Sequence, residues 1–123
     1  MSDHRYNLAE RLIDFAVMIL DLSEKMPATA GSVALTRQIV RSGTAPALNY
    51  GEALSAESPK DFLHKLRICL KELRETQITL QIIRRKMYVT GFDIGILLDE
   101  CNQLVAIFVT SVETKKRNMG MKV

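Results

Sequence analysis

Residues 58–87 read SPKDFLHKLRICLKELRETQITLQIIRRKM, and this stretch decides the fold of the chain. Its inward-facing positions recur at alternating intervals of four and three residues, the period of a helix that packs one face against other helices. These positions are Phe62, Leu66, Cys69, Leu73, Thr76, Leu80, Ile83 and Met87. Ser58 is a typical N-cap, and Pro59 suits the first helical position. The pattern predicts a helix over residues 59–88.

Two helices are predicted on the N-terminal side of this stretch. The first covers residues 7–25, where apolar residues show the same spacing, Asn7 can cap the start and Pro27 stops the helix. The second covers residues 32–56 and is less regular. Pro46 lies inside it, so we expect one backbone hydrogen bond to be missing and the helix to bend there.

A fourth helix is predicted over residues 93–115, after a break at Gly91. The tail, residues 116–123, has no periodicity, and we expect it to fray. Loops of about 4–6 residues between such helices force antiparallel neighbours. The sequence therefore predicts an all-α fold, an antiparallel up-down-up-down four-helix bundle, with residues 1–123 as a single domain.

Composition excludes several classes of protein. The chain has 123 residues, 47% of them hydrophobic and 25% charged, which is typical of a globular domain and not of a disordered one. With 6 Gly and 3 Pro, it has too few turn formers for an all-β sandwich. Continuous apolar runs are shorter than the roughly 20 residues that span a membrane, and the charged N-terminus lacks a secretory signal. We expect a cytoplasmic protein that does not contact membranes, with Cys69 and Cys101 as reduced thiols.

Enzyme signatures are lacking. A di-metal bundle needs two Glu-x-x-His pairs, whereas this chain offers only Asp61-x-x-His64 and Glu72-x-x-Glu75. No glycine-rich phosphate loop and no nucleophile elbow occurs. We therefore expect no enzymatic activity, with no catalytic residue, no metal site and no cofactor.

The outer side of the helix over residues 59–88 shows two features. Ile68, Ile78 and Ile82 lie away from the inward face, either as ordinary surface or as an interface between subunits. A narrow arc of the same helix carries five cations, either as a solvated face or as a ladder of phosphate contacts. They are Lys60, Arg67, Lys71, Arg74 and Arg85. Residues 59–123 carry 12 Lys/Arg against 7 Asp/Glu, a balance of +5, whereas the whole chain carries +3.

Polar residues occur on the helix over residues 32–56 where a bundle is normally apolar. Ser42 and Asn49 project inward, and Arg41 and Glu52 lie together on one flank. The facing helix offers Lys65, Glu72 and Glu75 as partners. The predicted role is a hydrogen-bond and ion-pair network that fixes the register of the helices. A ligand-binding cluster and an oligomer contact are the alternatives.

Three motifs resemble those of a known family. They are Arg41-Ser42-Gly-Thr-Ala-Pro-Ala-Leu-Asn49-Tyr-Gly-Glu52, Ser58-x-x-Asp61-Phe62-x-x-Lys65-Leu66 and Lys71-Glu72-x-Arg74-Glu75-Thr76. Together they are similar to motifs of the four-helix-bundle proteins encoded in intervening sequences of bacterial 23S ribosomal RNA genes, from about Tyr6 to Glu113. The chain departs from the family at Pro46, where many relatives carry Ile or Val.

The resemblance implies an antiparallel bundle that assembles into a homopentamer, and it implies no known reaction. Seven shared polar positions are implied to be structural: Arg41, Ser42, Asn49, Glu52, Asp61, Glu72 and Glu75. A distant branch, the accessory variability protein of diversity-generating retroelements, binds nucleic acid as a basic pentamer. Two hypotheses follow: a homo-oligomeric scaffold that binds RNA or DNA through its basic faces, or an adaptor whose partner is another protein.

Overall fold

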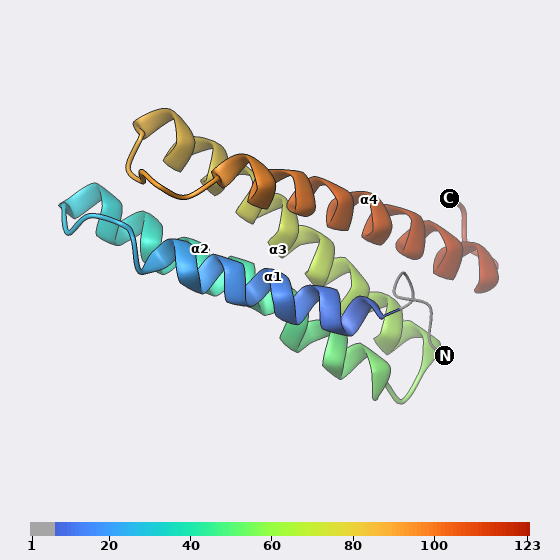
Figure 1. Cartoon of the computed structure of the whole chain (residues 1–123). Coiled ribbons are helices and arrows are strands. Elements are labelled where there is room, and N and C mark those ends of the chain that lie inside the picture. Colours follow the sequence, from blue (N-terminus) through green and yellow to red (C-terminus); the bar gives the residue numbers. More distant parts are fainter. Residues whose placement is uncertain (1–6) are drawn as a thin grey trace.

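Four helices make up the fold of the chain in a computed structural model that describes residues 7–123. They are α1 (Leu8–Ser23), α2 (Ala30–Leu54), α3 (Pro59–Lys86) and α4 (Ile94–Asn118). The helices pack against one another as a bundle, and no strand occurs in the described part of the chain (Figure 1). The predicted all-α four-helix fold is confirmed.

Contacts between helices show the direction of neighbouring elements. Arg41 of α2 bonds to Glu75 of α3, whereas Glu52, farther along α2, bonds to Lys65, nearer the start of α3. Partner numbers therefore fall along α3 as they rise along α2, which is the arrangement of antiparallel helices. Figure 1 shows that α1 begins and α4 ends at the same end of the bundle.

Side chains cap the start of each helix. The side chains of Asn7, Ser58 and Asp93 accept hydrogen bonds from backbone N–H groups of the first turn at 3.0–3.3 Å. Thr29 does the same for α2 at 3.4 Å. Each cap satisfies a donor that a helix start otherwise leaves unpaired. Because Thr29 is the cap, α2 begins at Ala30, two residues before the expected start.

Three helices end earlier than the sequence pattern suggested. After Ser23, the N–H groups of Lys25 and Met26 bond to carbonyls three residues back, so α1 closes in a tighter turn. α2 ends at Leu54 rather than residue 56. α3 ends at Lys86, because Met87 adopts a left-handed backbone conformation with φ 55°.

The fourth helix is longer than expected, and the prediction that the chain frays from residue 116 is wrong up to residue 118. α4 continues to Asn118. Its last turn contains Lys115, Lys116 and Arg117, whose positive charges are favoured at the negative end of the helix dipole. Lys115 is also held in place, because its Nζ lies 5.1 Å from the centre of the Phe62 ring.

The core consists of apolar side chains from all four helices. It contains Leu12, Phe15, Ile19, Leu22, Ile39, Ala53, Leu66, Cys69, Leu73, Leu80, Ile83, Leu97, Leu98, Cys101, Leu104 and Phe108. Two positions of the series that predicted α3 differ from expectation. Phe62 is only half-buried, and Met87 is 81% exposed because the helix has already ended there.

The helices are not equally connected. α3 packs along both α2 and α4, whereas α1 packs along α2 and touches α4 only lightly. A pair of half-buried side chains ties α1 to α4, since the Arg11 guanidinium donates to both Glu100 carboxylate oxygens at 2.7 and 3.1 Å. By length and composition, α4 is long and apolar enough to cross a membrane. This is weak evidence for a membrane span, because the core helices of soluble proteins meet the same criterion.

Candidate functional site

The basic face of α3 is exposed along its whole length. We use this name for Lys60, Arg67, Lys71, Arg74 and Arg85, which are all exposed. Within residues 7–123, none of the five forms an ion pair. At 1.5 Å of rise per residue, the first four extend over about 21 Å. This face can therefore meet several negative charges at once.

Two of the three predicted interface isoleucines lie on the same side of α3 as these cations. Ile78 and Ile82 are 57% and 43% exposed, and Ile68 is half-buried. At 100° per residue, Ile78 lies within the arc of the basic face and Ile82 about 20° beyond it. The outer side of α3 is thus cationic from Lys60 to Arg74 and apolar at Ile78 and Ile82.

The basic end of α4 lies near the start of the basic face. The contact between Lys115 and the Phe62 ring places the last turn of α4 beside the first turn of α3. Lys116 is half-buried and Arg117 is exposed. The fold therefore gathers the cations of α4 at the end of the bundle where Lys60 begins the basic face.

An arginine of α2 joins two carboxylates of α3. Nη1 of Arg41 donates to both oxygens of Glu72 at 2.9 and 3.0 Å, and Nη2 donates to Glu75 at 3.0 Å. Burial raises the pKa of Glu72, the neighbouring Glu75 raises it further, and Arg41 opposes both. The pKa of Glu75 is lowered, first by hydrogen bonding with Glu72 and then by Arg41. Glu72 therefore takes the first proton when the pH falls.

The remaining predicted polar residues do not form one cluster. Ser42 accepts a hydrogen bond from the buried Thr76 hydroxyl at 2.9 Å, which joins α2 to α3 inside the core. Lys65 donates to Glu52 at 2.7 Å on the surface. Asn49 donates to the Ala45 carbonyl of its own helix at 3.0 Å. Asp61 lies in the first turn of α3, where its backbone N–H bonds to the Ser58 cap.

These distances describe links between helices. In residues 7–123, no three His, Cys, Asp or Glu side chains gather closely enough to hold a metal ion. The two thiols are buried, and burial raises the pKa of both Cys69 and Cys101 to about 12. A thiol with that pKa is protonated at neutral pH and is a poor nucleophile.

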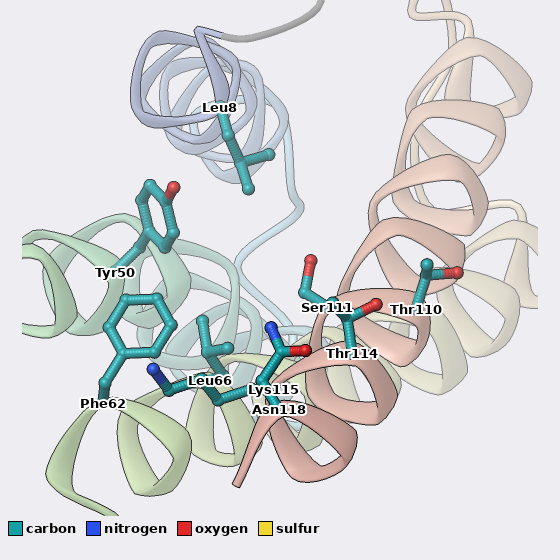
Figure 2. Close-up of a pocket in the computed structure, with 9 residues that line it drawn as sticks. All are labelled: Leu8, Tyr50, Phe62, Leu66, Thr110, Ser111, Thr114, Lys115 and Asn118. Carbon is teal, nitrogen blue, oxygen red and sulfur yellow. The ribbon is translucent and has the colours of Figure 1, made fainter. Parts of the chain in front are cut away.

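A cavity of about 340 Å³ opens at the end of the bundle where α1 begins and α4 ends. Figure 2 shows Tyr50, Phe62 and Leu66 on one side and the hydroxyl groups of Ser111 and Thr114 on the other. Burial raises the pKa of Tyr50, so its phenol is neutral at physiological pH. An apolar wall with a few hydroxyls could hold a small amphipathic group. Among residues 7–123, Lys115 is the one charged side chain that lines this cavity.

Two features were missed in the sequence analysis. The first is an exposed apolar stripe on the outside of α1, formed by Ile13, Val17 and Leu20. Their spacing of four and three residues indicates a second apolar face. It was overlooked because the core-facing stripe on the opposite side was sufficient to predict the helix. The second is the pair of Arg11 and Glu100, 89 residues apart in the sequence, for which no local pattern gives a signal.

Comparison with known proteins agrees with this architecture. Residues 5–110 match the family described as 23S rRNA-intervening sequence protein. Among solved structures, the chain is similar to a protein of unknown function from the S23 ribosomal protein family of Bacteroides thetaiotaomicron. The two share 28% sequence identity with a TM-score of 0.78, over 85% of this chain and 97% of that one. No curated protein matches the chain.

Proposed function

Because the chain belongs to the 23S rRNA-intervening sequence protein family, whose function is unknown, we propose the role of a non-enzymatic scaffold in the cytoplasm. Copies of the chain assemble, and the assembly binds the phosphate backbone of a nucleic acid. The observation that carries the proposal is the basic face of α3, in which Lys60, Arg67, Lys71, Arg74 and Arg85 are exposed without acidic partners among the described residues.

Assembly supplies the affinity that one copy lacks. A single chain carries +3, which attracts a polyanion only weakly. Repeating the face in an oligomer lets several copies contact one strand, so that each further contact becomes intramolecular. Each neutralised phosphate also releases counterions, which makes the binding depend strongly on salt. Lys116 and Arg117, near the start of α3, add charge at one end of the face.

The charges are arranged for backbone contact and not for reading of bases. The basic face carries no aromatic side chain on which a base could stack. The distance of about 21 Å between Lys60 and Arg74 is enough to follow several phosphates of one strand. We therefore expect little sequence specificity. The ratio of affinities for RNA and DNA will show whether the 2′-hydroxyl contributes.

The test is filter binding over a series of salt concentrations, with single-stranded and duplex RNA and DNA of one sequence. The Lys60→Glu, Arg67→Glu, Lys71→Glu triple variant should bind at least about tenfold more weakly than the parent chain and with a shallower salt slope. A matched control reverses three exposed cations elsewhere: Lys25, Arg37 and Lys122. If the control loses as much affinity as the triple variant, or if affinity is independent of salt, the basic face is not the binding surface.

An adaptor for another protein is the second candidate, and the exposed apolar stripe of α1 is the observation that favours it. Under this hypothesis the same triple variant captures its partner as well as the parent chain does. Co-purification from the native host, followed by nuclease treatment, separates the two. A partner that remains after the nuclease favours the adaptor.

A further inference from the structure

The outer side of α1 carries an unpartnered apolar stripe. Ile13, Val17 and Leu20 are 48%, 51% and 43% exposed. They lie on the side of the helix opposite to the core residues, such as Phe15 and Leu22. This 16-residue helix therefore has two apolar faces, of which the bundle buries only one.

Acidic residues accompany this stripe. Glu10, Asp14, Asp21 and Glu24 are exposed, and none of them forms an ion pair within residues 7–123. The one basic residue of α1 is Arg11, and its guanidinium is turned to Glu100 of α4. The outside of α1 is therefore both apolar and negative.

The isoleucine end of α3 has the opposite charge. Ile78 and Ile82 are exposed, and on the same side of the helix Arg74 precedes them and Arg85 follows them. This part of α3 is therefore both apolar and positive.

The two surfaces match in length as well as in charge. Arg74 and Arg85 are eleven residues apart, as are Glu10 and Asp21, which corresponds to about 16 Å along each helix. The exposed apolar side chains lie between the charges in both cases. An antiparallel or a parallel approach would thus bring acids to arginines and aliphatic side chains to isoleucines.

The surfaces are on different sides of one copy. α1 packs along α2, and α3 packs along α2 and α4, so α1 and α3 occupy opposite corners of the bundle. We propose that the acidic apolar face of α1 in one copy docks on the isoleucine end of α3 in the next copy. Such a contact is heterologous, so each copy gives one face and receives the other, and the assembly closes into a ring or grows as a chain.

This docking rests on the proposed function only in its assumption that copies assemble. It leaves Lys60, Arg67 and Lys71 uncovered for phosphates, because they precede the docking surface along α3. Arg74 and Arg85 then belong to the subunit contact rather than to the nucleic-acid contact.

The test uses two variants, Val17→Glu and Ile78→Glu, each of which breaks one of the two surfaces. Analytical ultracentrifugation of the parent chain should give a species several times 13.9 kDa, and each variant alone should sediment as a monomer. A mixture of the two should form a one-to-one heterodimer, because one intact face of each kind remains. The control, Ile96→Glu, changes an exposed isoleucine of α4 and should assemble like the parent chain.

Each result decides the matter. A monomeric parent chain, a variant that stays assembled, or a mixture that remains monomeric overturns the docking model. Circular dichroism establishes that the variants are folded, as expected for exposed positions. The proposed function is measured separately on the Lys60→Glu, Arg67→Glu, Lys71→Glu variant, which should sediment like the parent chain and bind nucleic acid weakly. If it assembles and binds nucleic acid normally, the proposed function fails and the docking stands.

Discussion

The Arg41 guanidinium links two carboxylates of unequal burial. The Glu72 side chain is 9% exposed, whereas that of Glu75 is 37% exposed, so the same cation acts on one nearly desolvated and one hydrated charge. Burial of an unpaired carboxylate is costly, and the arginine offsets that cost without being buried itself. If Arg41 is removed, Glu72 stays nearly buried without its cation, and the stability of the fold then depends on whether Glu72 is protonated.

Replacement of Arg41 by Met should destabilise the fold by about 1–2 kcal/mol at pH 7, less than for a fully buried pair because the arginine is largely exposed. Loss of the cation raises the pKa of Glu72 farther above its ordinary value of 4.5. A carboxyl whose pKa is raised on folding stabilises the protein below its unfolded pKa, and this contribution is lost as the pH rises through the folded pKa. The difference in melting temperature from the parent chain should therefore be small at pH 4 and grow towards pH 7.

The control for this prediction is the Arg41→Met, Glu72→Gln double variant. It has no carboxyl at position 72, so its difference from the Glu72→Gln single variant should change with pH only through Glu75, and by less than the difference for Arg41→Met itself. If the difference in melting temperature between Arg41→Met and the parent chain does not change with pH, the arginine does not stabilise the ionised form of Glu72.

Two glycines of α2 should respond in opposite ways to the same substitution. A Cβ at Gly43 would lie 2.7 Å from Cγ1 of the fully buried Ile19, whereas a Cβ at Gly51 would meet no atom within 4 Å. Gly43→Ala should cost about 1–3 kcal/mol of unfolding free energy by overpacking the contact of α1 with α2. Gly51→Ala should add up to about 1 kcal/mol, because alanine favours the helix. Urea unfolding measures both, and equal effects would contradict this close approach.

At the scale of the element, caps and helix ends follow from short-range chemistry. Ser58, Pro59 and Asp61 fix the start of α3 with atoms that are neighbours in sequence, so this start was predictable. The end of α4 was not, because Lys115, about two turns beyond the core residue Phe108, is held by a ring from another helix. Local patterns therefore predict helix starts better than helix ends in this chain.

The backbone at the end of α3 is strained at Met87, and a substitution there can relieve the strain. Met87 has φ 55°, a conformation that costs a residue with a Cβ about 1–2 kcal/mol and costs glycine almost nothing. Its side chain is 81% exposed, so little packing is lost when it is removed. Met87→Gly should raise the unfolding free energy by about 0.5–1 kcal/mol in thermal unfolding. Met87→Ala keeps the Cβ and should give no gain; a gain from alanine would show that the side chain, and not the backbone, causes the strain.

At the scale of the whole molecule, α3 packs along two neighbours, whereas α1 and α4 each pack along one neighbour and touch each other only lightly. α3 contacts two neighbours along its length, whereas α1 depends on α2 and on the link between Arg11 and Glu100. Regions with fewer contacts open at lower free energy. The face of α1 that we propose for docking thus lies on one of the two helices with fewer contacts in the bundle.

Hydrogen exchange should show this difference in support. The Arg11→Met variant should exchange the amides of α1, such as those of Phe15 and Ile19, about five- to tenfold faster than the parent chain, because the charged hydrogen bonds to Glu100 are lost. Amides at the centre of α3, such as that of Leu73, should be unchanged. The Lys65→Met variant removes an exposed ion pair between α2 and α3 and serves as the control. Equal acceleration in all four helices would mean that the bundle opens only as a whole.

The sequence by itself determined the four helices and their inward faces. A period of 3.6 residues, a cap and a proline act within a few residues of one another, so Leu66, Leu73 and Leu80 could be assigned to the core without coordinates. It also identified Arg41, Glu72 and Glu75, since polar side chains on the packed flanks of two helices need partners.

Only the tertiary structure decided which surfaces remain uncovered. Whether Ile78 or Ile68 is the more exposed depends on how closely neighbouring helices approach, and that distance is set by side chains far away in the sequence. The same holds for Arg11 and Glu100, which meet only because four antiparallel helices bring α1 and α4 together. Local periodicity specifies which face of a helix is apolar, whereas the geometry of packing specifies which apolar residues are left for a partner.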